Sequence, residues 1–198
     1  MSSLPFPFDI IPHYLKVVQF GLLPTMRTVL KCPSLLLQPS SLSRLFFSYV
    51  WGTLGPAIDA NSHAWKPPLL HPHAYGVVLD VGAGHGHTMK YLDKTKVTKY
   101  VAIEPNVWMH ERIREMARTC GFSEEKGEVV VLGCGAEDSE RIYAAIGGEG
   151  KVDTVVSLLT LCTVKDPSKA IEGLNTMLKE GGQLLWCEHV SSPFSNVR

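Results

Sequence analysis

Apolar and polar residues alternate in two different ways along the chain, and the change falls near residue 75. Beyond it, short valine-rich apolar runs are separated by stretches whose apolar residues recur at helical spacing, which indicates alternating strands and helices. The expected strands are "GVVLDV", "KYVAIE", "GEVVVLGCG", "KVDTVVSLLTLC" and "QLLWCEHV", and the expected helices are "HTMKYLDK", "NVWMHERIREMARTCG", "DSERIYAAIGG" and "DPSKAIEGLNTMLKEGG". Asn106 is expected to cap the second helix and Gly121 to end it, while Pro167 starts the last helix and a glycine pair stops it.

The five strands are nearly continuous apolar runs, as expected when helices cover both faces of a parallel sheet. The chain is therefore predicted to form an α/β fold, a doubly wound and mostly parallel sheet with right-handed crossovers. Ligands of such sheets bind at the carboxyl ends of the strands, near the point where the strand order reverses.

Residues 1–74 have a different pattern, in which ten prolines divide an apolar segment into short pieces. One helix is expected within "HYLKVVQFGLL" and another within "PSSLSRLFFSYVWGTLGPAI", capped by Ser40 or Ser41. The second helix has a wide apolar face, which could pack onto the following domain, cover an active site or touch a membrane. Two domains are expected: an N-terminal helical, proline-rich segment over 1–74 and a ligand-binding domain over 75–198.

Charge and cysteine content narrow the function classes. Lys+Arg and Asp+Glu both number 19, so no overall field favours nucleic acid, and no nucleic-acid partner is expected. Five cysteines without a C-x-x-C pair argue against a disulfide framework or a metal site and favour a reducing compartment. No secretory signal and no membrane-spanning run is recognisable, so the expected location is cytoplasmic, with contact at the periphery of an intracellular membrane left open.

The stretch "VVLDVGAGHGHT" carries the first chemical signal. Gly82, Gly84 and Gly86 follow the first strand, and residues without Cβ allow a tight turn and let a ligand lie against the backbone. A dinucleotide fingerprint, G-x-G-x-x-G, would need glycine where His87 stands. Glu104 ends the second strand, where a carboxylate can accept hydrogen bonds from both ribose hydroxyls, or can be a solvated charge at a strand end.

Five stretches resemble, in this order, the motifs of class I S-adenosylmethionine-dependent methyltransferases. They are the G-x-G-x-G loop, the acid of "IEPN", "GCGAED", "VDTVVSLLTLC" and "LKEGGQLLWCEHV". The resemblance covers about residues 75–192 and implies S-adenosylmethionine as the cofactor. The residues that it places around the cofactor are Asp80, Gly82, Ala83, Gly84, His85, Gly86, Glu104, Pro105, Asn106, Gly135, Ala136, Glu137, Ser157, Leu158 and Leu159. His85 and His87 lie at this loop, where their imidazoles either take part in the cofactor site or are only exposed to water.

"IEPN", "LCTVKDP" and "WCEHV" are closer to the branch that includes the thiol methyltransferases of animal endoplasmic reticulum and lipid droplets. The resemblance implies methyl transfer to a small, apolar acceptor, a thiol or a lipid-like molecule. A thiolate acceptor needs alignment more than acid–base catalysis. Glu188 and His189 are the candidates to face the acceptor, or they hydrogen-bond to each other or to a nearby loop. Cys162 has no activating base that the sequence reveals.

The family continues beyond the fifth strand with a helix and an antiparallel strand pair, whereas here only "SSPFSNVR" follows Val190. The last strand pair is therefore expected to be missing, so that the domain is a fragment, a shortened gene product or half of a homodimer that covers its sheet edge. Two alternatives to a methyltransferase stay open: a non-catalytic cofactor-binding remnant and a nicotinamide-dependent oxidoreductase.

Overall fold

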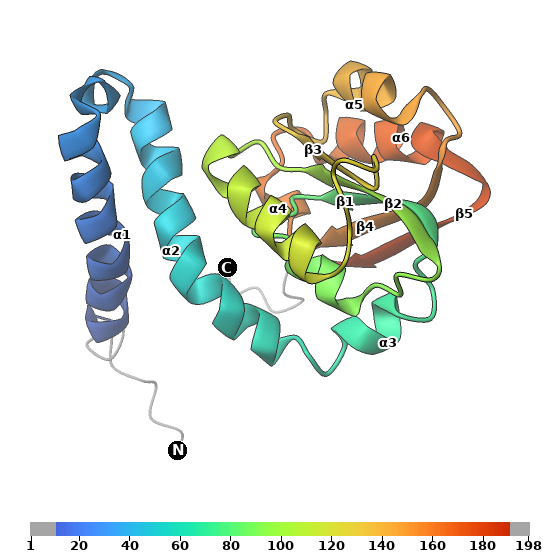
Figure 1. Cartoon of the computed structure of the whole chain (residues 1–198), viewed down its shortest axis with the longest axis horizontal. Helices are drawn as coiled ribbons and strands as arrows, with labels where there is room; N and C mark the ends of the chain where they lie inside the picture. The colour runs from blue at the N-terminus through green and yellow to red at the C-terminus, as the bar shows by residue number, and fades with distance from the viewer. Residues whose placement is uncertain (1–10, 191–198) are drawn as a thin grey trace. The chain divides into compact units, whose positions relative to one another are not determined.

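The computed structural model describes residues 11–190 (Figure 1). The chain divides between Asn61 and Ser62 into two compact units. The change of pattern near residue 75 marks the start of the sheet at Gly76. The second unit begins earlier in the chain because a short helix before the sheet buries Leu70 completely in the core of that unit.

The elements of the second unit follow the expected alternation. In chain order they are α3 (Lys66–Leu70), β1 (Gly76–Val81), the 3₁₀ helix η3 (His87–Tyr91), β2 (Val97–Ile103), η4 (Val107–Met109), α4 (His110–Thr119), β3 (Val129–Leu132), α5 (Ser139–Ile146), β4 (Val152–Leu158), η5 (Leu161–Thr163), α6 (Pro167–Met177) and β5 (Leu178–Cys187).

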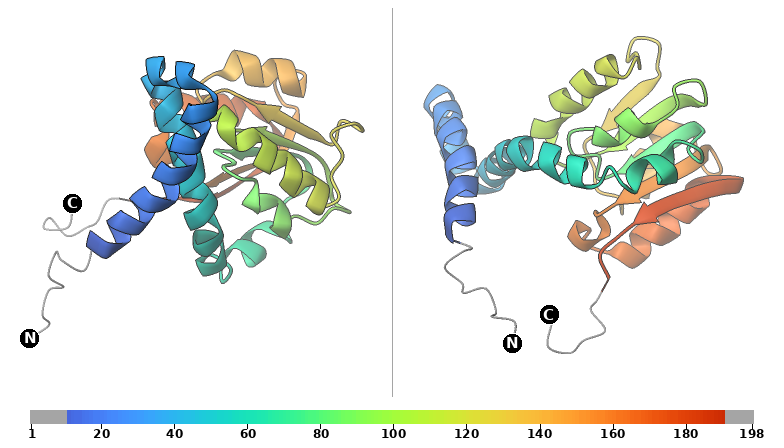
Figure 2. Two further views of the ribbon diagram at one scale, coloured as in Figure 1. Left: turned by 60° about the vertical axis from the view of Figure 1, so that its left-hand side comes forward. Right: turned by 90° about the horizontal axis from the view of Figure 1, so that it is seen from below.

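The five strands form one sheet in the order β3-β2-β1-β4-β5, and every neighbouring pair is parallel. The chain runs outward from β1 to β2 and β3, then returns to the other side of β1 for β4, so the strand order reverses beside β1 (Figure 1). The doubly wound α/β fold predicted from the sequence is confirmed. Within residues 11–190 no strand follows β5, which lies at one edge of the sheet and exposes Leu184 and Trp186 (Figure 2).

Each strand contributes side chains to two separate apolar cores. On one face of the sheet, residues such as Val78 and Tyr100 pack with residues of α3, η3 and α4. On the other face, residues such as Leu79 and Val101 pack with α5 and α6. Figure 1 shows these helices on opposite faces. Burial on both faces explains why the strands read as continuous apolar runs.

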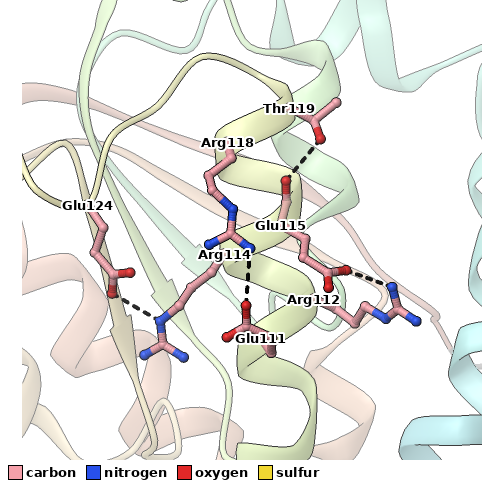
Figure 3. A network of polar contacts seen from close by, with 7 residues as sticks. All are labelled: Glu111, Arg112, Arg114, Glu115, Arg118, Thr119 and Glu124. Carbon is pink, nitrogen blue, oxygen red and sulfur yellow. Dashed lines mark hydrogen bonds and ion pairs between the residues drawn. The ribbon is translucent and has the colours of Figure 1, made fainter.

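The outer surface of α4 carries a set of ion pairs, which Figure 3 shows from close by. Arg112 pairs with Glu115 at 2.6 Å, Arg114 with Glu124 at 3.1 Å, and Arg118 with Glu111 at 3.1 Å. Exposed pairs of this kind contribute about 0–1 kcal/mol each. Their effect is that each of the three arginines of α4 is matched by a glutamate.

Two expected helices of the second unit differ in the structure. "HTMKYLDK" forms only the short 3₁₀ helix η3, which follows the left-handed Gly86. The last helix ends at Met177 and not at the glycine pair, since Leu178 is already extended and begins β5. Gly181, at a φ of +76°, instead bends the first part of that strand. Asn106 caps η4 and Asp166 caps α6, and each side chain accepts a hydrogen bond from a backbone N–H of its helix.

In the first unit, the expectation that prolines cut the chain into short pieces is wrong. The unit consists of α1 (Ile11–Lys31), η2 (Pro33–Leu37) and α2 (Pro39–Asn61), and Pro24 and Pro56 lie inside the two long helices. Interior prolines cost about 3 kcal/mol in an isolated helix, but packing between helices can outweigh that cost. Because α2 begins at Pro39, Ser40 and Ser41 lie inside it and do not cap it.

The two helices of the first unit pack against each other closely. A Cβ at Gly21 would lie 2.5 Å from the ring of Phe46, so the missing side chain is what allows this approach. The hydroxyls of Thr28 and Tyr49 hydrogen-bond across the pair at 2.8 Å. The apolar face predicted for α2 thus covers α1. Between residues 11 and 190, no helix combines the length and the apolar character needed to cross a bilayer.

Candidate functional site

The loop after β1 is a bend of three glycines in left-handed conformations. The φ angles of Gly82, Gly84 and Gly86 are +68°, +57° and +76°, a region that other residues adopt only with strain. A Cβ on Gly82 would also lie 2.3 Å from Cγ2 of Thr160, in the loop after β4. Glycine at position 82 is therefore required both by the bend and by the close packing of two loops at the carboxyl edge of the sheet.

The end of β2 holds this bend in place. The N–H groups of Gly82 and Ala83 donate to the carbonyl of Ile103 at 2.8 and 3.1 Å. The Glu104 carboxylate accepts the N–H of Gly84 at 2.9 Å through Oε2 and the N–H of Asn106 at 2.8 Å through Oε1. Glu104 is only 7% exposed, so the interpretation of it as a solvated strand-end charge is wrong.

His110, which sequence reasoning missed, supports the same strand end. Its Nε2 lies 2.8 Å from the carbonyl oxygen of Glu104, and because a carbonyl only accepts, Nε2 carries the proton and donates it. The ring also lies against the end of β3, 3.3 Å from where a Cβ of Gly133 would stand. The histidine could not be singled out from the sequence because it is the first residue of an ordinary charged helix.

The stretch after β3 lies at the same edge of the sheet. Ala136 is buried, and Glu137 bends back so that its carboxylate occupies the space beside Gly135, where a Cβ would meet Oε2 at 2.5 Å. The Asp138 side chain caps α5 by accepting the N–H of Arg141. Gly135, Ala136 and Glu137, the residues expected to contact the cofactor, thus form a tight turn at the carboxyl end of β3.

Glu188, the first residue after β5, holds the loop after β4 in place through hydrogen bonds. Its carboxylate accepts the hydroxyl of Ser157 at 2.7 Å and the N–H groups of Thr160 and Leu161 at 2.9 and 3.1 Å. Leu159, at a φ of +56°, is the one described non-glycine residue in the left-handed region. Its N–H donates to the carbonyl oxygen of Cys187 at 2.8 Å. Of the two roles considered for Glu188, the structure shows a hydrogen bond to a neighbouring loop.

His189, the other candidate at the end of β5, contacts Cys162 and not Glu188. Its Nδ1 lies 3.8 Å from the sulfur of Cys162, and both side chains are exposed. The two residues are 27 positions apart, which explains why no base for Cys162 was visible in the sequence. No group of three histidine, cysteine, aspartate or glutamate side chains placed to hold a metal ion occurs in the described part of the chain.

Asp80 lies in β1 beneath the glycine bend, and its carboxylate is directed into the apolar core. It accepts a hydrogen bond from the hydroxyl of Tyr100 and another from Thr88. Burial raises the pKa of Asp80 to about 6, because these hydrogen bonds and the charge of Lys66 only partly offset the loss of water. The Tyr100 pKa is raised well above 10, so its hydroxyl remains a donor. Asp80 therefore supports the loop from below.

His85 is buried in the glycine bend at 8% exposure, so the expectation of an imidazole exposed to water is wrong for this residue. Burial, followed by the charges of His87 and Arg112, lowers its pKa to about 4. His85 is thus neutral at pH 7. His87 is half-buried, and its Nδ1 accepts a hydrogen bond from the ammonium of Lys90 at 3.2 Å.

These residues fit the adenosyl part of S-adenosylmethionine. The glycine bend is backbone without Cβ atoms at three positions, and it lies beside the reversal of strand order, where doubly wound folds bind ligands. The carboxylate of Glu104 offers only acceptor oxygens, which is what the two hydroxyl donors of a ribose require. Glu104, the turn after β3 and the loop after β4 all lie at the carboxyl edge, around the bend.

Comparisons with known proteins agree with this geometry. A family model described as a methyltransferase domain matches residues 57–197. The mitochondrial methyltransferase OMS1 of Saccharomyces cerevisiae is 28% identical over 131 residues, which are 61% of this chain and 27% of that protein. The human thiol S-methyltransferase TMT1B is 27% identical over 164 residues, 78% of this chain and 62% of that protein. The chain thus spans less than two thirds of the length of either relative.

Solved structures support the fold. A Leishmania major structure described as an S-adenosylmethionine-dependent methyltransferase superposes with a TM-score of 0.53 at 20% identity, over 73% of this chain and 56% of that one. The YcgJ protein of Bacillus subtilis superposes with a TM-score of 0.50 at 21% identity, over 66% and 51%. At these identities the likeness shows the shared architecture.

Asp80 should make the stability of the protein depend on pH. Its pKa rises from an ordinary 3.8 to about 6 on folding, so the folded chain binds the proton more tightly. Its contribution is fully present below pH 3.8 and is lost as the pH rises through 6. Relative to Asp80→Asn, the unfolding free energy of the wild type should fall by about 3 kcal/mol across this range.

Urea unfolding at several pH values measures this difference, and comparison with the variant cancels the pH dependence of other groups. The exposed substitution Glu125→Gln is the matched control and should follow the wild type. A constant difference between Asp80→Asn and the wild type from pH 4 to 7 would contradict the prediction.

Proposed function

The chain belongs to the methyltransferase domain family, and we propose that it transfers a methyl group from S-adenosylmethionine to a small apolar acceptor, a thiol or a lipid-like molecule. The observation that carries the proposal is the buried carboxylate of Glu104, joined to the N–H of Gly84 at the tip of β1. A thiol is favoured as the acceptor group because a relative that aligns with 78% of this chain, at 27% identity, is named a thiol S-methyltransferase.

S-adenosylmethionine supplies, when bound, a methyl group already activated by the positive charge of its sulfur. The protein then has to orient the two reactants and exclude water, which by themselves can contribute most of the rate enhancement. Glu104 would hold the ribose, the glycine bend the methionyl part, and the turn Gly135–Glu137 the adenine edge. The backbone around Ser157 to Leu159 would face the reacting methyl group, and Glu188 keeps that backbone in place.

His189 is a candidate to take a proton from the acceptor. Histidine titrates near neutrality in general, and this side chain is exposed just beyond β5. Glu188 is better described as a positioning residue for the loop after β4, since its carboxylate already binds a hydroxyl near the end of β4 and two N–H groups of that loop.

Calorimetric titration tests the cofactor directly. We expect saturable binding of S-adenosylmethionine and of its demethylated product, and no binding of NAD, because His87 replaces the last glycine of the dinucleotide fingerprint. Glu104→Gln should weaken binding about 10- to 100-fold, equivalent to about 1–3 kcal/mol for a lost hydrogen bond to a charged group. Glu180→Gln, an exposed carboxylate at the start of β5, should leave the affinity unchanged.

Gly84→Val should abolish binding while the circular dichroism of the chain stays that of the wild type. An unchanged affinity in Gly84→Val and Glu104→Gln would contradict the assignment of the loop. Methylation of a small thiol, followed by mass spectrometry, tests the transfer itself. Binding of the cofactor without any methylated product from thiols or lipid-like acceptors would instead support a non-catalytic cofactor-binding protein.

We further propose that the first unit contacts the surface of an anionic membrane. The last turn of α1 and the connection η2 expose three leucines, Leu30 at 79%, Leu36 at 62% and Leu37 at 85%. Arg27, Lys31 and Arg44 flank them, and the sequence has no acidic residue between positions 10 and 58. Apolar side chains bordered by cations are what an interfacial segment requires to bind anionic lipid.

Cosedimentation with phosphatidylserine-containing vesicles tests this contact. The double substitution Leu36→Ser and Leu37→Ser should reduce the bound fraction about tenfold or more, since each buried leucine contributes about 1.5–3 kcal/mol. Ile171→Ser, which removes a half-exposed apolar side chain from α6, is the matched control. Equal binding of the double variant and the wild type would exclude η2 as the contact.

A further inference from the structure

The pair formed by Cys162 and His189 lies outside the residues assigned to the adenosyl part of the cofactor. Cys162 stands in η5, which is separated from the end of β4 by two residues, and His189 follows the end of β5. The sulfur lies 3.8 Å from Nδ1 of His189 and 3.9 Å from the carbonyl oxygen of Leu159. A nucleophile and a base within hydrogen-bonding reach is the arrangement by which proteins activate a thiol.

The two side chains are held together by the chain segments that carry them. Glu188, the residue before His189, accepts the N–H groups of Thr160 and Leu161, the two residues before Cys162. The parallel pairing of Leu158 with Cys187 fixes the same two segments one step earlier. The thiol and the imidazole therefore belong to a framework that does not depend on their own weak contact.

Three of the other four cysteines, Cys32, Cys120 and Cys134, are in different surroundings. Burial raises the pKa of Cys120 and of Cys134, which favours the unreactive protonated thiol. Cys32 is exposed like Cys162, but its neighbour is the hydroxyl of Ser34 at 3.3 Å. A hydroxyl is a much weaker base than an imidazole, so Cys32 serves as an exposed internal reference for Cys162.

From this arrangement we propose that Cys162 is a modification site for low-molecular-weight disulfides. Nδ1 of His189 takes the thiol proton, and the Cys162 thiolate attacks one sulfur of a disulfide R–S–S–R. The S–S bond of the reagent breaks, a mixed disulfide Cys162–S–S–R forms, and the leaving thiolate receives the proton from His189 to become R–SH. The disulfide is the only oxidant required, and an excess of free thiol reverses the reaction.

The reaction is tested without cofactor, so its outcome is independent of methyl transfer. The full chain is incubated at neutral pH with 2-hydroxyethyl disulfide, an uncharged probe, then quenched at intervals and mapped by peptide mass spectrometry. Cys162 should form the mixed disulfide about tenfold faster than Cys32 in the same molecule, because the thiolate is the attacking species. Addition of dithiothreitol should restore the free thiol.

His189→Gln keeps a polar side chain but cannot take the proton, and it should slow Cys162 to the rate of Cys32. His73→Gln removes an exposed histidine just before β1, at the amino ends of the strands, whereas Cys162 and His189 lie at the carboxyl ends. This variant should leave the rate at Cys162 unchanged. Because Cys32 is measured in every variant, a general loss of structure would be recognised. Equal rates at Cys162 and Cys32 in the wild type, or an undiminished rate at Cys162 in His189→Gln, would overturn the proposal.

Discussion

The carboxylate of Glu104 fixes the conformation of the glycine bend, and the geometry of the candidate site depends on it. The bend alternates left-handed glycines with Ala83 and His85 and closes only part of its hydrogen bonding internally, through the N–H of Gly86 and the carbonyl of Ala83, so its other N–H groups need acceptors elsewhere. The end of β2 provides them through the carbonyl of Ile103 and through Glu104. Hydrogen bonds to a charged group contribute about 1.5–3 kcal/mol each, which is enough to select one conformation of a short loop.

A second carboxylate plays the same part on the other side of β1. Glu188, beyond β5, binds the backbone after β4, just as Glu104, beyond β2, binds the backbone after β1. The two loops meet where Thr160 packs against Gly82. In each case an acid at the tip of one strand sets the loop of its neighbour, so the backbone that would face the cofactor is positioned before any ligand binds. Such preorganisation reduces the cost of ordering the loops on binding.

The polar groups beneath the bend are less favourable to stability. Asp80 and Tyr100 form a hydrogen-bonded pair in a core that is otherwise apolar, and the raised pKa of Asp80 shows that the pairing does not fully replace water. His85 is likewise buried and neutral. Buried polar groups that lose solvation are common near functional sites. Here they lie directly under the loop expected to hold the cofactor, and His85 lies within it.

Much of the fold could be predicted from the sequence because its signals are local. The valine-rich runs specified the strands, the alternation specified a parallel sheet, and Gly82, Gly84 and Glu104 marked its ligand-binding edge. The two helices of the first unit were expected, but their full length was not, since Pro24 and Pro56 lower local helix propensity and packing between the helices offsets that cost. The support of Glu104 by His110, the fastening role of Glu188 and the approach of Cys162 to His189 also required the structure. These contacts join residues on different elements, and only the pairing of β4 with β5 and the packing of α4 at the end of β2 bring them within bonding distance.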